Sequence, residues 1–127
     1  KRKLKDVTVI ALAGSDEKVA LCKANGADHC INYKTTNYVD AVNRIVGEKP
    51  KGLDVGPPRG GVHVAFNGVS GPTLVTDPLV IRKRGRWVIY GYAGGRGVID
   101  TSPFGYDAIT IMPMVANITS EWYSAGR

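Results

Sequence analysis

The sequence VTVIALAGSDEKVALCKANGADHCINY, residues 7–33, decides the fold class. Residues 7–13 form a nearly continuous apolar run, which is typical of a strand buried on both faces of a parallel sheet. Gly14 ends that strand, and Ser15 offers a hydroxyl that caps a helix of about ten residues. A second strand follows at residues 29–31. Strand, helix and strand in this order predict a βαβ crossover, whose loops lie at the carboxyl edge of a sheet.

The loops of this crossover carry polar side chains that suit a phosphate group. In Rossmann sheets an acidic residue at the end of the second strand binds the 2′-hydroxyl of NAD. Gly14 and Ser15 stand there instead, while Lys18 lies one turn into the helix and Tyr33 closes the next strand. A hydroxyl, an ammonium and a phenol can converge on the 2′-phosphate of NADP. The alternative is a helix cap and two surface side chains, and spacing alone does not separate the two readings.

Helices and strands continue to alternate along the chain. We expect the first helix to bury an apolar stripe of Val19, Leu21 and Cys22. A second amphipathic helix is predicted within residues 34–47, capped by Thr35 or Thr36 and stopped by Gly47. It is followed by a connection rich in proline and glycine, and then by the apolar run VHVAFN, which predicts another strand.

The last third of the chain predicts one more helix and two more strands. Pro78 interrupts the helix, because proline lacks an amide donor. The basic run 82–86 is expected at the end of that helix, where cations interact favourably with the dipole. Strands are predicted at residues 86–91 and, at the end of the chain, at residues 115–119. The whole pattern is that of an α/β doubly wound parallel sheet.

Three runs resemble the cofactor domain of zinc-independent medium-chain dehydrogenases/reductases, in the quinone oxidoreductase (zeta-crystallin-like) and enoyl reductase branch. The runs are GSDEKVALCKANGADHCINYK at 14–34, GVHVAFNGVSG at 61–71 and GRWVIYGYAGG at 85–95. The resemblance covers about residues 7–95 and implies a Rossmann-type domain that binds NADP. In this family the serine and lysine of S-x-x-K and the tyrosine of I-N-Y contact the 2′-phosphate of NADPH. The resemblance therefore implies that Ser15, Lys18 and Tyr33 contact the 2′-phosphate of NADPH in this chain.

The resemblance also implies contacts at the ends of two later strands. Asn67, Gly68 and Val69 stand where the family contacts the adenosine ribose and base, and Gly91 and Tyr92 stand at the nicotinamide face. Glycine permits close approach of a ligand to the backbone. The alternatives are a turn that needs glycine only for its geometry, and a tyrosine that is a surface aromatic.

The chain departs from the family pattern in two places. No apolar strand followed by G-x-G-x-x-G or A-x-x-G-V-G precedes Val7, and GPPRGG stands as an insertion before the strand at Val62. In the Rossmann order 3-2-1-4-5-6 the missing first strand lies between these two strands. We therefore expect residues 1–127 to be a truncated NADP-binding Rossmann domain, without the GroES-like catalytic domain of the family. Alone, it should neither reduce substrates nor hold NADPH tightly.

Composition and charge set the outer bounds on function. The chain has 127 residues, of which 43% are hydrophobic and 22% charged, as expected for one globular domain. No apolar run approaches the ~20 residues of a membrane helix, and no signal-like segment is present, which predicts a cytoplasmic protein without membrane contact. Cys22 and Cys30 lack metal-ligand spacing, and His29 and His63 fall in strands, so we expect neither a disulfide nor a metal site.

The implied function is hydride transfer from NADPH to a quinone or an α,β-unsaturated carbonyl, in a protein that is expected to be a homodimer acting on a small molecule. No nucleophilic triad is present, and the catalytic residues stay unassigned. Two alternatives remain open. The first is a non-catalytic family member that binds or scaffolds. The second is an RNA-binding zeta-crystallin-like protein, since 17 basic and 11 acidic residues give a net charge of +6. Aromatic residues do not interleave with the basic runs, which weakens the nucleic-acid reading.

Overall fold

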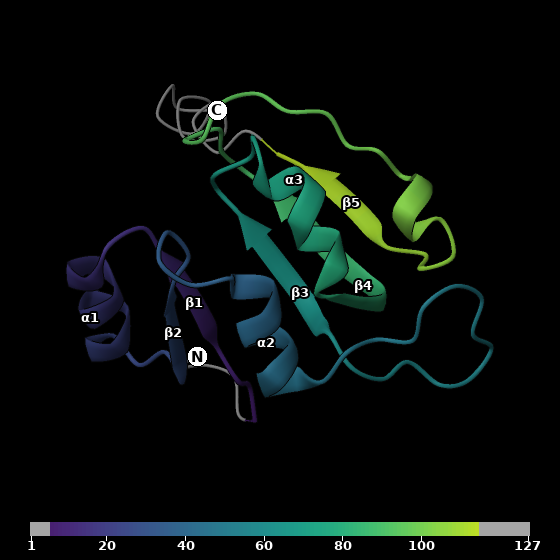
Figure 1. The fold of residues 1–127 in the computed structure, drawn as a ribbon, viewed down its shortest axis with the longest axis horizontal. Coiled ribbons are helices and arrows are strands. Elements are labelled where there is room, and N and C mark those ends of the chain that lie inside the picture. Colours follow the sequence, from purple (N-terminus) through teal and green to yellow (C-terminus); the bar gives the residue numbers. More distant parts are fainter. Residues whose placement is uncertain (1–5, 115–127) are drawn as a thin grey trace, which may run out of the picture. The chain divides into compact units, whose positions relative to one another are not determined.

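The computed structural model describes residues 6–114, and the chain divides into two units, residues 1–45 and residues 46–127. Each unit has its own parallel sheet (Figure 1). No helix among the described residues is both long and apolar enough to cross a bilayer. The two units are taken in turn.

The first unit contains the predicted βαβ crossover. Strand β1 (Ile10–Ala13) leads through helix α1 (Asp16–Ala24) to strand β2 (His29–Asn32). The two strands are parallel, with Ile10 opposite His29 and Ala13 opposite Asn32. The predicted order of elements is therefore confirmed, although β1 is shorter than the apolar run that announces it.

The predicted cap of α1 is present, but the apolar face predicted for this helix is not buried. The Ser15 hydroxyl accepts a hydrogen bond from the main-chain N–H of Lys18 at 3.3 Å, and Gly26 turns away at φ +96°. No residue of α1 is buried, and Leu21 is 63% exposed. The predicted stripe is wrong because residues two apart point about 200° apart around a helix. Val19 and Leu21 therefore lie on opposite sides.

Helix α2 spans Tyr38–Val46, whereas an N-cap at Thr35 or Thr36 would have started it at residue 36 or 37. Asn37 caps it instead, and its side-chain oxygen accepts hydrogen bonds from the main-chain N–H groups of Val39 and Asp40 at 3.1 and 3.4 Å. Thr35 and Thr36 belong to the preceding turn, because the N–H of each donates to the carbonyl of Asn32. Tyr38 and Val42 are buried, as an amphipathic helix requires.

The second unit is a parallel three-stranded sheet in the order β3-β4-β5, which Figure 1 shows as neighbouring arrows. The strands are β3 (Val62–Asn67), β4 (Ile81–Ile89) and β5 (Thr110–Pro113). Three short helical segments connect them: α3 (Thr73–Thr76), η1 (Asp77–Leu79) and η2 (Ser102–Phe104). The predicted interruption at Pro78 is confirmed, because α3 stops and the 3-10 turn η1 takes its place.

Two predictions about this unit are wrong. The basic run 82–86 does not end a helix, because β4 already begins at Ile81. Pairing shifts from Val62 opposite Ile81 to Val64 opposite Arg86, so the run forms an irregularity within the strand. The strand β5 was not predicted, since its terminal proline argues against a strand. The strand predicted at residues 115–119 lies outside the described residues.

The core of the second unit is built around the central strand. Trp87 and Ile81 of β4 have no exposed surface, and Leu74, Ile89 and Phe104 pack with them. The rings of Trp87 and Phe104 meet edge to face, with centroids 6.4 Å apart. This core packs strand β4 against residues of α3 and η2.

Candidate cofactor site

In the first unit, candidate ligand-binding residues surround Gly14, directly after β1. A Cβ atom placed on Gly14 would lie 3.0 Å from the Tyr33 hydroxyl oxygen and 3.3 Å from Cε of Lys34. Both side chains therefore reach across the end of β1, beside the Ser15 hydroxyl that caps α1. The structure brings Tyr33 to the loop of Ser15, as the sequence predicted, and leaves the Lys18 side chain exposed on the first turn of α1.

Asn32 organises the polar groups around that loop. Its side-chain amide donates to Asp16 at 2.8 Å, and its side-chain oxygen accepts from the main-chain N–H of Lys34 at 3.0 Å. The carboxylate nearest to Ser15 is thus held by an amide. Hydroxyl, phenol and ammonium groups are left to meet a ligand at the end of β1.

Lys34 was not among the residues singled out from the sequence. It follows Tyr33 directly and is exposed. Its stem reaches the end of β1 because the chain turns after β2, where Thr35 and Thr36 bond to the carbonyl of Asn32. The signal that would have found it is the local run of a phenol and a lysine at a strand end, a pairing that suits a phosphate.

In the second unit, candidate ligand-binding residues lie at the carboxyl end of β3. Asn67 is only 5% exposed, and its side chain is used inside the protein. The side-chain oxygen accepts from the N–H groups of Val69 and Ser70, each at 2.8 Å. The side-chain nitrogen donates to Thr73 and Asp77. A ligand at this end would therefore meet the main chain of Gly68 and Val69 more readily than the Asn67 side chain.

Glycines let the ends of β3 and β4 come together. A Cβ atom on Gly91 would lie 2.7 Å from the carbonyl oxygen of Gly68, and one on Gly68 would lie 2.8 Å from the Tyr90 hydroxyl. The Ser70 hydroxyl donates to the carbonyl of Gly91 at 2.6 Å. Tyr92, in contrast, is 59% exposed and stands apart in the following turn. Gly68, Val69 and Gly91 therefore share one edge, as predicted, and their contacts with a cofactor stay a prediction.

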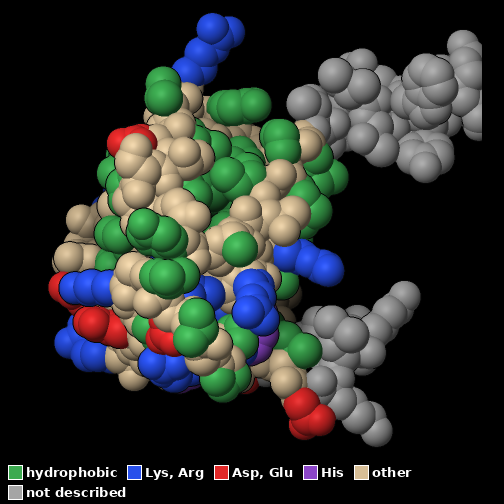
Figure 2. All heavy atoms as spheres, turned by 90° about the vertical axis from the view of Figure 1, so that its right-hand side faces the viewer, with side chains coloured by type: hydrophobic (Ala, Val, Ile, Leu, Met, Phe, Trp, Pro, Cys, Tyr) green, Lys and Arg blue, Asp and Glu red, His purple; other side chains and the backbone are tan. Residues whose placement is uncertain are grey.

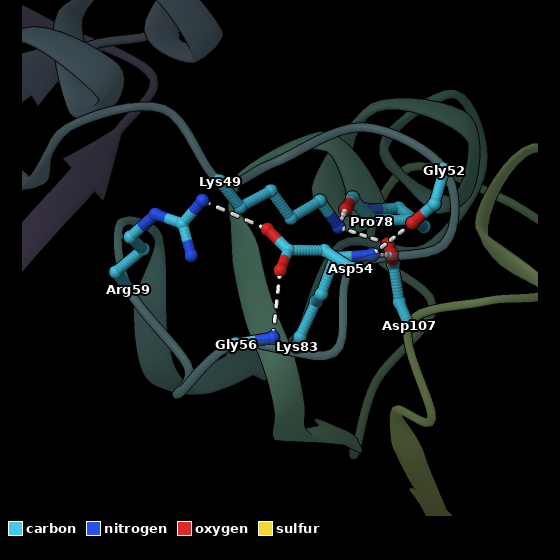
Figure 3. Close-up of polar contacts among 8 residues, drawn as sticks. All are labelled: Lys49, Gly52, Asp54, Gly56, Arg59, Pro78, Lys83 and Asp107. Carbon is cyan, nitrogen blue, oxygen red and sulfur yellow. Dashed lines mark hydrogen bonds and ion pairs between the residues drawn. The ribbon is translucent and has the colours of Figure 1, made fainter.

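A different group of charges lies at the amino edge of the same sheet. Lys49 and Lys83 converge on Asp107, at 2.5 and 3.0 Å, and their ammonium groups also donate to the carbonyls of Pro78 and Gly52 (Figure 3). A hollow of about 300 Å³ opens beside this cluster, at the start of β4. Rossmann ligands bind at the opposite, carboxyl ends of the strands. The cluster therefore holds the inserted connection rather than the cofactor.

The inserted connection also has an ion pair of its own. Asp54 lies 2.8 Å from the guanidinium of Arg59 and accepts a hydrogen bond from the main-chain N–H of Gly56 (Figure 3). The pKa of Asp54 is lowered from its ordinary 3.8, first by the Gly56 hydrogen bond and then by the charge of Arg59. The connection that contains the predicted insertion GPPRGG is thus closed by specific polar contacts.

Metal-ligating residues do not gather in the part of the chain that the structure describes. No group of three histidine, cysteine, aspartate or glutamate side chains lies close enough to hold an ion within residues 6–114. Cys22 and Cys30 are free and half-buried, and the His63 ring lies 2.6 Å from the guanidinium of Arg82. These residues do not fit a zinc site.

Comparison with known proteins identifies the class to which this geometry belongs. Residues 3–126 match the family model described as zinc-binding dehydrogenase, and the chain belongs to this family. The resemblance to the quinone oxidoreductase branch and the Rossmann-type α/β fold are both confirmed.

Individual relatives agree with that assignment. The chain is 37% identical over 87 residues to quinone oxidoreductase-like protein 2 of Rattus norvegicus, covering 68% of this chain and 22% of that one. It is 31% identical over 88 residues to 2-haloacrylate reductase of a Burkholderia species, covering 69% and 23%. The crystal structure of Escherichia coli quinone oxidoreductase complexed with NADPH superposes with a TM-score of 0.68 at 18% identity, covering 92% and 36%. The chain thus spans about a quarter of the length of the curated relatives.

Proposed function

We propose that this chain is the NADP-binding part of an oxidoreductase that transfers hydride from NADPH to a quinone or an α,β-unsaturated carbonyl. The observation that carries the proposal is the group around Gly14, where Ser15, Tyr33 and Lys34 meet at the end of β1. The Escherichia coli relative is described with NADPH, and the Burkholderia relative reduces a haloacrylate, whose double bond is conjugated with a carboxyl group. A small electron-poor substrate is in keeping with both.

The selectivity for NADPH rests on the 2′-phosphate. The Ser15 and Tyr33 hydroxyls can donate to phosphate oxygens, and the exposed ammonium groups of Lys18 and Lys34 supply charge. Asp16 accepts a hydrogen bond from the Asn32 amide at 2.8 Å, which fixes the direction of its carboxylate. In NAD-binding Rossmann sites an acidic side chain at this place would repel the phosphate.

In the second unit, the family resemblance implies cofactor contacts at the glycine edge, which is formed by the carboxyl ends of β3 and β4 at Gly68 and Gly91. NADPH supplies the hydride, and this chain's residues bind and orient it through the main chain of Gly68, Val69 and Gly91, with Tyr92 beside the nicotinamide face. A partial Rossmann domain over residues 1–127, a catalytic domain outside this chain, a homodimer and a cytoplasmic location belong to the proposal through the family resemblance alone.

The nucleic-acid alternative receives little support from the basic run 82–86. Lys83 is buried against Asp107 and Arg82 donates to the carbonyl of Gly60, so only Arg84 and Arg86 of this run are exposed. On the face shown in Figure 2, basic side chains lie beside acidic ones in the lower part of the view. A mixed surface of this kind lacks the single-sign potential that a polyanion needs.

Replacing Lys18 tests the phosphate assignment. In the intact protein, Lys18→Ala should weaken NADPH binding by roughly tenfold or more and leave NADH binding unchanged, because a hydrogen bond to a charged group contributes about 1.5–3 kcal/mol. Fluorescence titration with both cofactors measures the preference. Lys23→Ala is the matched control, since Lys23 is also exposed on α1 but lies in its last turn. Equal affinities for NADPH and NADH in the unmodified protein, unchanged by Lys18→Ala, would overturn the assignment.

A further inference from the structure

Beneath the glycine edge, a buried carboxylate joins β3 to β4. Asp77 of η1 is 8% exposed, and one of its oxygens accepts two hydrogen bonds. The Asn67 side-chain nitrogen donates to that oxygen at 2.5 Å, and the indole N–H of Trp87 donates to it at 3.1 Å. Both donors are themselves buried, so this contact is shielded from water and its geometry is tightly constrained.

The carboxylate determines which way the Asn67 amide faces. A carboxylate accepts hydrogen bonds, so it requires the NH₂ end of the amide, which also reaches Thr73 at 2.8 Å. The carbonyl end is then directed to the opposite side, where it accepts from the N–H groups of Val69 and Ser70. A flipped amide would set oxygen against oxygen on one side and NH₂ against two N–H groups on the other. Without the carboxylate this preference is weaker.

The loop of residues 68–70, which Asn67 fixes, also contacts the end of β4. The Ser70 hydroxyl donates to the Gly91 carbonyl at 2.6 Å, and the N–H of Gly94 donates to the Val69 carbonyl at 2.7 Å. Thr73 accepts from Asn67 and donates to the Ser70 carbonyl at 2.7 Å, which closes the network. The main chain on both sides of the glycine edge is therefore set by one chain of side-chain bonds that begins at Asp77.

We propose that Asp77 is a positioning residue for the cofactor. Acting through Asn67, it fixes the main chain of residues 68–70 and, through Ser70, that of Gly91. It touches no part of the ligand. The inference rests on the proposed function for its consequence in binding, whereas its structural step, the orientation of the Asn67 amide, stands on the bonds just described.

The first test removes the accepting oxygen and keeps a side chain of similar length. Asp77→Leu in the intact protein should raise the Kd for NADPH by about tenfold or more and should speed hydrogen exchange at the amides of Val69 and Ser70. Asp107→Leu is the matched control, because Asp107 is a similarly buried carboxylate of the same unit that lies at the amino edge. It should destabilise the fold, yet leave the Kd for NADPH within about twofold wherever the protein is folded.

The second test restores an accepting oxygen without the charge. In Asp77→Asn the side-chain carbonyl oxygen can accept from both Asn67 and Trp87, because both of these hydrogen bonds go to a single oxygen of Asp77. NADPH affinity and slow exchange at residues 69 and 70 should therefore stay within about threefold of the unmodified protein. If Asp77→Leu does not fold, Asp77→Ala takes its place in this comparison. A role in stability alone would not require an acceptor facing the turn.

The outcomes separate this inference from the proposed function. Asp77→Leu with unchanged Kd and unchanged exchange at residues 69 and 70, or Asp77→Asn with an effect as large as that of Asp77→Leu, would overturn the role of Asp77. An unmodified protein that binds no NADPH would overturn the proposed function. In that case faster exchange at residues 69 and 70 in Asp77→Leu would still support the control of the turn by Asp77, and unchanged exchange would contradict it.

Discussion

The two edges of the β3-β4-β5 sheet each bury a carboxylate, but with different partners. At the carboxyl edge Asp77 accepts hydrogen bonds from an amide and an indole, both neutral. At the amino edge Asp107 is paired with the ammonium groups of Lys49 and Lys83. Neutral donors of fixed geometry orient a neighbouring side chain, whereas two ammonium groups on flexible stems chiefly balance charge. The buried carboxylate at the carboxyl edge therefore fixes the geometry of the turn after β3, whereas the one at the amino edge anchors the loop that carries Lys49.

The largest effect is expected when the carboxylate at the amino edge, Asp107, is removed. Asp107→Ala leaves two buried ammonium groups uncompensated, which should lower the free energy of unfolding by about 3–5 kcal/mol. Chemical denaturation measures the loss. Arg59→Ala is the control, because the Arg59 side chain of the neighbouring ion pair is 60% exposed. It should cost no more than about 1 kcal/mol. A similar cost for both variants would show that the Lys49–Asp107–Lys83 cluster does not hold the loop.

An added methyl group should reduce stability more at Gly91 than at Gly68. Gly91→Ala places a Cβ 2.7 Å from the carbonyl oxygen of Gly68, so the backbone must shift, at a cost of about 1–3 kcal/mol. Gly68→Ala meets the ring of Tyr90, which is 46% exposed and can rotate away, so less than about 1 kcal/mol is expected. Thermal unfolding of the two variants gives the order. The reverse order would mean that the two strand ends are not held together as described.

The smallest effect expected is the acid response of the inserted connection. The pKa of Asp54 is lowered from 3.8 by the Gly56 hydrogen bond, so its contribution to stability is present above pH 3.8. This contribution is lost as the pH falls through the lowered pKa. Asp54→Asn should therefore flatten part of the decline in denaturation midpoint from about pH 6 to about pH 2. A carboxyl resonance of Asp54 that titrates at or above 3.8 would contradict the contact.

Much of the first unit could be predicted because its signals are local. An apolar run, a glycine stop and a serine cap act within a few residues, and they give β1 and α1 correctly. The same local chemistry placed Ser15 and Tyr33 at one sheet edge, since the carboxyl ends of parallel strands meet there. The stripe on α1 failed because apolar content was counted without its angular position around the helix.

Some features could not be predicted from the sequence because they depend on which strands pair. The start of β4 was missed because residues 82–86 are basic, and only pairing with β3 makes them part of a strand. Tertiary override of local preference is expected where a strand lies at the centre of a sheet. Lys34 was missed for a related reason, since its reach over Gly14 depends on how β1 and β2 pair.

By itself, the sequence determined the parallel α/β class, the crossover of the first unit and the polar residues at its strand ends, because capping, turn formation and apolar periodicity depend on neighbouring residues. Only the tertiary structure decided that Asn67 faces inward to Asp77, and that Lys49 meets Asp107 across 58 positions of the chain. Such contacts form only when distant segments of the chain pack together, because burial makes every unpaired polar group costly and so favours the partners that are present.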